Sequence, residues 1–254
     1  MNTTVASDAA DAIELPVASV RPLPVRVDLY SFVHRGLRAA IAQALVDVGR
    51  AAPEFEDAER VAKQVEDLVY LCRTHLEHEN DFIHTAMNRR VPGSAKRTEG
   101  DHLEHEHAMT RLAELVSRLR SAVTVAELRE TLGSLYRSLS LFLAHNLEHM
   151  DIEEQSNMRV LWSAYTDAEL ESLEHELVQS LDPETMLAFL RWMVPNVSAP
   201  ERLAFFEKMQ LGAPPEVVVG TLTALSEYLP GGEVERLLGH LAIRMSQEEA
   251  LVRA

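Results

Sequence analysis

Two stretches of the chain carry the same pair of side chains, a histidine followed four residues later by a glutamate. The first pair is His75 and Glu79, and the second is His149 and Glu153. A step of four residues puts both members of a pair on one face of an α-helix, one turn apart. Imidazole nitrogens and carboxylates together suit divalent transition metals. Each pair is therefore a candidate half of a metal site.

The apolar residues around the two pairs predict that both face the same core. Taking about 100° per residue from the stripe centres Val65 and Leu139, each histidine lies about 80°, and each glutamate about 40°, to the same side of its stripe. A shift of 74 positions superposes the two segments. We therefore expect two helices that present matching ligands to one place.

Histidines on two further helical segments complete the set. His34 precedes Leu37 by three residues, and His102 or His105 precedes Met109 and Leu112 at helical steps. Burying this many imidazoles and carboxylates without compensation would cost several kcal/mol per charge, whereas a pair of divalent cations would stabilise them jointly. A shell without thiolate suits iron or manganese, with zinc as a further alternative. The predicted metal ligands are His34, His75, Glu79, His102, His105, His149 and Glu153.

Other polar side chains near these positions receive different interpretations. His145, one turn before His149, is a candidate extra ligand, and His84 is a candidate pocket residue or support for a ligand. Glu154 is either such a support or plain surface. We expect His78 and His107 to be solvated, and Cys72 to be a small buried hydrophobe rather than a ligand.

Four long helical segments must position these ligands. Helical periodicity runs from Val27 to Gly49, from Pro53 to Val91, from a start between Ser94 and Asp101 through Leu119, and from Thr124 toward Tyr165. Glycine and proline number only 21, and helix-favouring residues dominate. We predict an all-α chain in which residues 28–165 form an antiparallel up-down-up-down four-helix bundle.

The two ends of the chain differ from this central part. Residues 1–27 contain Pro22 and Pro24, which favour an extended backbone, and we interpret them as a flexible leader. Residues 166–254 lack a histidine cluster and are predicted to form a C-terminal extension of five short helices. Their N-terminal signals are Thr166-Asp167, Asp182-Pro183, Ser198-Ala199-Pro200, Pro214-Pro215 and Gly231-Gly232.

Composition limits the partners. Forty acidic against 24 basic residues give a formal net charge of −16, which disfavours nucleic acid and anionic membrane surfaces. No stretch approaches the roughly 18 apolar residues of a membrane span. Because a single cysteine can form no internal disulfide, we expect a cytoplasmic protein.

Residues 28–165 resemble the hemerythrin-like, or HHE cation-binding, four-helix bundles. The resemblance rests on His34, on His75 and Glu79 in His-x3-Glu-Asn, on Asp101-His102, and on His149 and Glu153 in His-x3-Glu-Glu. It implies an antiparallel bundle that holds a non-haem di-iron centre, with Glu79 and Glu153 as bridging carboxylates.

The chain also departs from the oxygen-carrying hemerythrins, and three functions follow from the resemblance. Those proteins bear His-x3-His on the third helix and a bridging aspartate on the fourth, where this chain has His102 with His105, and Glu153. The first hypothesis is binding or sensing of O2 or NO. The second is an O2-activating oxidase or oxygenase acting on a small-molecule substrate. The third is iron storage or repair under nitrosative stress.

Overall fold

A computed structural model describes residues 26–241, and over these residues every regular element is helical. None of the helices in this range combines the length and apolar character needed to cross a bilayer. The α-helices are α1 (Ser31–Arg50), α2 (Phe55–His78), α3 (Thr85–Arg90), α4 (Lys96–Ser121), α5 (Val125–Ile152), α6 (Met158–Ala164), α7 (Asp167–Ser180), α8 (Pro183–Met193), α9 (Ala199–Gly212) and α10 (Pro215–Leu225). Residues 233–241 are also helical. The prediction of an all-α chain is confirmed for the described residues.

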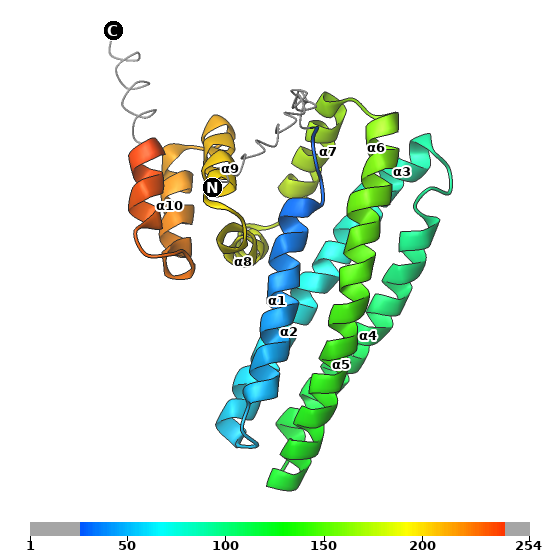
Figure 1. Cartoon of the computed structure of the whole chain (residues 1–254), viewed down its shortest axis with the longest axis vertical. Coiled ribbons are helices and arrows are strands. Elements are labelled where there is room, and N and C mark those ends of the chain that lie inside the picture. Colours follow the sequence, from blue (N-terminus) through cyan, green and yellow to red (C-terminus); the bar gives the residue numbers. More distant parts are fainter. Residues whose placement is uncertain (1–25, 242–254) are drawn as a thin grey trace, which may run out of the picture.

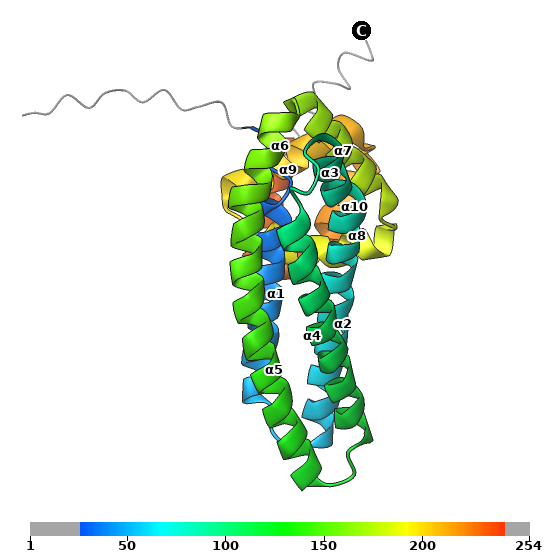
Figure 2. The ribbon, with the colours of Figure 1, turned by 90° about the vertical axis from the view of Figure 1, so that its right-hand side faces the viewer.

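Four long helices, α1, α2, α4 and α5, lie side by side (Figures 1 and 2). Hydrogen bonds between residues close in sequence stabilise the starts of α1 and α5. The Asp28 carboxylate accepts hydrogen bonds from the backbone N–H groups of Tyr30 and Ser31 at the start of α1. Thr124 and Glu127 form a reciprocal capping box at the start of α5, which satisfies N–H groups that lack a helical partner. The α4 helix begins at Lys96, inside the range predicted for it.

The space between these four helices is layered. One apolar cluster fills most of their length and includes Leu68, Leu112 and Leu139. A second apolar cluster near the α3 and α6 end includes Ile83 and Met87. Histidines and glutamates on the inward faces lie in sequence between residues of these two clusters, so apolar side chains border them in both directions along the helices.

Each of the five signals predicted after Tyr165 is followed by a helix. Most of these helices share a separate apolar cluster that includes Phe206 and Leu222. The α7 helix is the exception, because its Leu170 belongs to the cluster of Ile83. The α8 helix contributes Leu190 to the cluster of Phe206, but it also packs against α1 and places Phe189 in the core of the four long helices. The two helices lie close together at Gly36, where an added Cβ would be 2.9 Å from the Met193 backbone nitrogen. The sequence boundary at Tyr165 therefore does not separate the two sets of side chains completely.

The predicted leader falls almost entirely outside the described residues. Its last two residues, Arg26 and Val27, are held against the end of α6. The Arg26 guanidinium donates to the backbone carbonyls of Trp162 and Tyr165, at 2.6 and 2.9 Å. The Trp162 indole N–H in turn donates to the Val27 carbonyl, at 2.7 Å.

Candidate metal centre

Six of the seven predicted ligands come together in two overlapping groups. One group contains His34, His75, Glu79 and Glu153, and the other contains Glu79, His102, His149 and Glu153. Within each group the candidate ligand atoms all lie within 4.8 Å of one another. Both glutamates belong to both groups, which is the arrangement that two adjacent cations bridged by carboxylates require.

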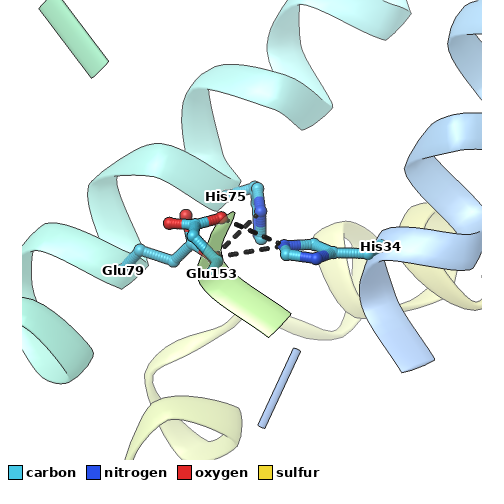
Figure 3. Close-up of side chains that lie close together, drawn as sticks. All are labelled: His34, His75, Glu79 and Glu153. Atoms are coloured by element: carbon cyan, nitrogen blue, oxygen red, sulfur yellow. Dashed lines mark ion pairs between the residues drawn. The ribbon is translucent and has the colours of Figure 1, made fainter. Parts of the chain in front are cut away.

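Figure 3 shows the first group, with His34 reaching from α1 toward His75 and Glu79, which come from the neighbouring helical segment, and with Glu153 between them. The His75 Nε2 atom lies 3.1 Å from Glu79 Oε1. The His34 Nε2 atom lies 3.5 Å from the same oxygen and 3.4 Å from Glu153 Oε2. One cation at this position would contact imidazoles from two helices and carboxylates from two helices.

The second group repeats this pattern with the other two long helices. The His102 Nε2 atom lies 3.4 Å from Glu79 Oε2 and 3.6 Å from Glu153 Oε1. The His149 Nε2 atom lies 3.2 Å from Glu153 Oε2. Glu79 thus turns one oxygen to His34 and His75 and its other oxygen to His102, as a bridging carboxylate does.

Unsatisfied polar atoms show that the site fits metal ions. All six side chains are buried, and the most exposed of them, His75, has an exposed fraction of only 8%. Yet both oxygens of Glu79, both oxygens of Glu153, and the Nε2 atoms of His34 and His75 lack a hydrogen-bond partner. Buried polar atoms are normally paired, and each unpaired one costs about 1–3 kcal/mol. Cations bound among these atoms would remove that cost, so the buried His/Glu groups could hold metal ions.

A π-helical segment begins at each of the two glutamates. The first, η1, covers Glu79–His84 and continues α2, and the second, η2, covers Glu153–Asn157 and continues α5. Hydrogen bonds in a π-helix run from residue i to i+5, so a residue five positions later returns to the same face. His84 thereby stays on the inner side after Glu79, and its Nε2 atom lies 3.8 Å from Glu153 Oε1.

The carboxylates also control the protonation of the imidazoles. Burial alone would lower the pKa of His34, but Glu154, Glu79 and Glu153 outweigh it and raise this pKa to about 9. Burial likewise opposes the effect of Glu153 and Glu79 on His102, whose pKa rises to about 9. For His75, burial dominates and lowers the pKa to about 4. The two glutamates stay ionised, since burial is outweighed mainly by neighbouring histidines and their pKa values fall below the usual range.

Three of the histidines are also held by their second ring nitrogen. The Nδ1 atom of His34 lies 3.0 Å from Glu154 Oε1, that of His102 lies 2.8 Å from Asn80 Oδ1, and that of His149 lies 3.4 Å from Asp101 Oδ2. An oxygen acceptor at Nδ1 keeps the proton there, so that the Nε2 atom is the one that would release its proton and bind a metal. The sequence leaves Glu154 as either a support for a ligand or plain surface, and its contact with His34 favours the first interpretation.

The remaining predicted positions lie at the margin of the site or outside it. His105 is buried but belongs to neither group, and its ring centre lies 4.7 Å from that of His149. Burial and the neighbouring His149 lower its pKa to about 3. His145 and His107 are exposed. Cys72 is buried among apolar residues, which raises its thiol pKa to about 12, so it stays protonated.

Sequence reasoning missed several residues of the site. Tyr30 is fully buried and its ring centre lies 5.3 Å from that of His34. Burial, together with Glu153 and Glu79, raises the pKa of the Tyr30 hydroxyl. Asn157 donates to this hydroxyl at 3.3 Å and to Thr98 at 3.2 Å. The helical segment predicted from Val27 included Tyr30, one turn before His34, without singling it out, and the helix itself begins only at Ser31.

Comparisons with protein-family models, with curated proteins and with solved structures give no match to this chain.

Proposed function

We propose that this chain is a hemerythrin-like, non-haem di-iron protein that binds O2 or NO. In this proposal α1, α2, α4 and α5 form the antiparallel up-down-up-down bundle of that family. The observation that carries the proposal is the sharing of Glu79 and Glu153 by both ligand groups. His34 and His75 would complete the position of one iron ion, and His102 and His149 that of the other.

The donor set supports iron. Each position has two imidazoles and two carboxylates, a mixture of nitrogen and oxygen donors without thiolate that suits iron or manganese better than a structural zinc site. Four protein donors leave coordination positions open on an ion that prefers five or six. An iron pair bound there would supply reversible electron donation to a small diatomic ligand.

The surroundings favour a diatomic ligand over a larger substrate. All six candidate ligands are buried, and Phe142 and Ile83, each 2% exposed, belong to the apolar clusters that border them. A cleft of about 810 Å³ lies between α2 and α8, but none of the six residues lines it. A substrate bound in that cleft would not touch the proposed ligands, whereas O2 and NO are small enough to pass between packed side chains.

Anaerobic metal analysis followed by rapid-mixing absorption spectroscopy tests the proposal. We expect two iron ions per chain and a spectral change on mixing with O2 or NO that reverses when the gas is removed. Glu153→Ala should abolish both results, and Asp151→Asn, at an exposed position on α5, should leave both unchanged. An irreversible change with net O2 consumption would instead identify an oxidase, and a chain without bound metal would contradict the proposal.

A further inference from the structure

The two shared glutamates are each followed by a polar residue that contacts a histidine on a neighbouring helix. Asn80 follows Glu79, and its Oδ1 atom accepts from His102 Nδ1 at 2.8 Å. Glu154 follows Glu153, and its Oε1 atom accepts from His34 Nδ1 at 3.0 Å. Each polar residue thus accepts a hydrogen bond from a candidate ligand, at the ring nitrogen that faces away from the metal position.

These two contacts are equivalent by an internal repeat. Asn80 and Glu154 are 74 positions apart, the same separation as Glu79 and Glu153, and each is the second residue of a π-helical segment. The repeat relates α2 to α5, and it exchanges the roles of α1 and α4, which supply His34 and His102. The shared glutamates and the π-helical segments are alike in the two halves, and the side chain behind the histidine differs.

The difference is one of charge. Glu154 is a carboxylate whose side chain is 18% exposed, and Arg38 fixes it by donating to the same oxygen at 2.6 Å. Asn80 is a neutral amide on an exposed residue, and its oxygen is shared between His102 and His84, the latter at 3.1 Å. A hydrogen bond to an ionised acceptor is stronger than one to a neutral acceptor, and it increases the basicity of the donating imidazole.

A second carboxylate near the site does not balance this difference. Asp101 lies behind His149 in the second group, but its oxygen is 3.4 Å from Nδ1 and its side chain is 35% exposed. A longer contact in a more solvated place has a weaker electrostatic effect. The hydrogen bond to His34 Nδ1 in the first group is therefore stronger than those to His102 and His149 in the second group.

We propose that Glu154 and Asn80 make the two metal positions unequal, so that the ion between His34 and His75 binds first and more tightly than the ion between His102 and His149. This inference rests on the proposed two-metal centre. Glu154 and Asn80 act as positioning residues, because they touch the histidines rather than the ions.

Stepwise titration of the metal-free chain with Co²⁺ under anaerobic conditions tests the inference. Co²⁺ reports its own coordination through visible absorption, and calorimetry gives the two dissociation constants. We expect two steps in the wild-type protein, separated by at least about tenfold, since the loss of such support weakens metal binding by about 10–100-fold.

Two reciprocal substitutions make the test independent of general damage to the fold. Glu154→Gln should weaken the tight step by about 10–100-fold, and Asn80→Asp should tighten the weak step by a similar factor. The two steps should therefore merge in both variants, at low affinity in the first and at high affinity in the second. Glu148→Gln, at an exposed position on α5, should keep the wild-type separation.

The outcomes separate this inference from the function on which it rests. Two bound ions with a separation that neither Glu154→Gln nor Asn80→Asp changes would overturn the inference and leave the two-metal centre in place. A wild-type chain that binds fewer than two ions would overturn both.

Discussion

The four long helices and the C-terminal helices each bury carboxylates, but only the C-terminal helices also supply their hydrogen-bond partners. Glu233 receives hydrogen bonds from Arg202 at 2.8 Å and from Arg236 at 2.8 Å, on both of its oxygens. Arg202 also donates to the carbonyl of Val197. By contrast, none of the four carboxylate oxygens of Glu79 and Glu153 has a hydrogen-bond donor.

This difference distinguishes a structural use of buried charge from a functional one. A buried ion pair with complete hydrogen bonds is self-sufficient, and removing one partner mainly costs stability. Buried carboxylates that converge without donors need positive charge nearby, which protonated His34 and His102 supply in the metal-free chain and bound cations would supply in their place. The C-terminal cluster therefore needs nothing from outside the chain, whereas the centre between the four helices is suited to receive cations.

The largest expected effect is the loss of both metals when either shared glutamate is removed. Because Glu79 and Glu153 each belong to both groups, Glu79→Ala and Glu153→Ala should each reduce the metal content from two ions per chain to none. Elemental analysis of the purified variants measures this. Glu77→Ala, at an exposed position on α2, should bind metal normally. Retention of two ions by either glutamate variant would refute the bridging assignment.

Removal of Glu233 should have the opposite profile, with a loss of stability and no loss of metal. Glu233→Ala leaves the buried Arg202 guanidinium without its carboxylate, which should lower the free energy of unfolding by about 1–3 kcal/mol. Denaturant titration measures the change, with the exposed Glu235→Ala as the matched control. A reduced metal content in folded Glu233→Ala protein would show that the two regions are not independent.

Close packing at Gly36 connects the two regions, and Gly36→Ala should disturb both. The new methyl group would lie 2.9 Å from the Met193 backbone nitrogen, so α8 must move away from α1. Overpacking of this kind costs about 1–3 kcal/mol. Because His34 lies two residues away, we also expect weaker metal binding in equilibrium dialysis. Gly100→Ala, where an added Cβ meets no neighbour, should instead be neutral or stabilising.

The ion pairs of Glu233 should make the stability of the metal-free protein depend on pH in the acid range. Hydrogen bonds from Arg236 and Arg202 outweigh burial and lower the pKa of Glu233 to about 2, from about 4.5. A carboxylate whose pKa is depressed by folding stabilises the protein above its unfolded pKa, and this contribution disappears as the pH falls toward its folded pKa. The stability difference between wild type and Glu233→Gln should therefore shrink between pH values of about 5 and 2. A stability difference that does not change with pH would contradict the ion pairs assigned to Glu233.

The three histidines of α4 should show graded effects, from the loss of one ion at most to no effect. His102→Ala should remove or weaken the ion of the second group, because His102 lies within 3.6 Å of both shared glutamates. His105→Ala should change metal affinity much less, since His105 belongs to neither group, and the exposed His107→Ala should leave it unchanged. Anaerobic iron titrations of the three variants would give this order. A larger effect for His107 than for His102 would refute it.

The sequence by itself determined the features that depend on helical periodicity. A four-residue step fixes the relative position of His75 and Glu79, and of His149 and Glu153, whatever the helix packs against. The capping signals at Thr124, Thr166 and Asp182 fixed helix starts for the same reason, because their hydrogen bonds are local. Local geometry was therefore enough to nominate both pairs and to predict an all-helical chain.

Only the tertiary structure decided the features that depend on how neighbouring helices are rotated. It placed His102 in a ligand group and His105 outside one, although the two are a single turn apart. It put Glu154 and Asn80 behind histidines of other helices, and it placed Phe189 of α8 in the core of the four long helices. These contacts join residues far apart in the chain, so their geometry is set by packing between helices, which no periodicity within one helix encodes.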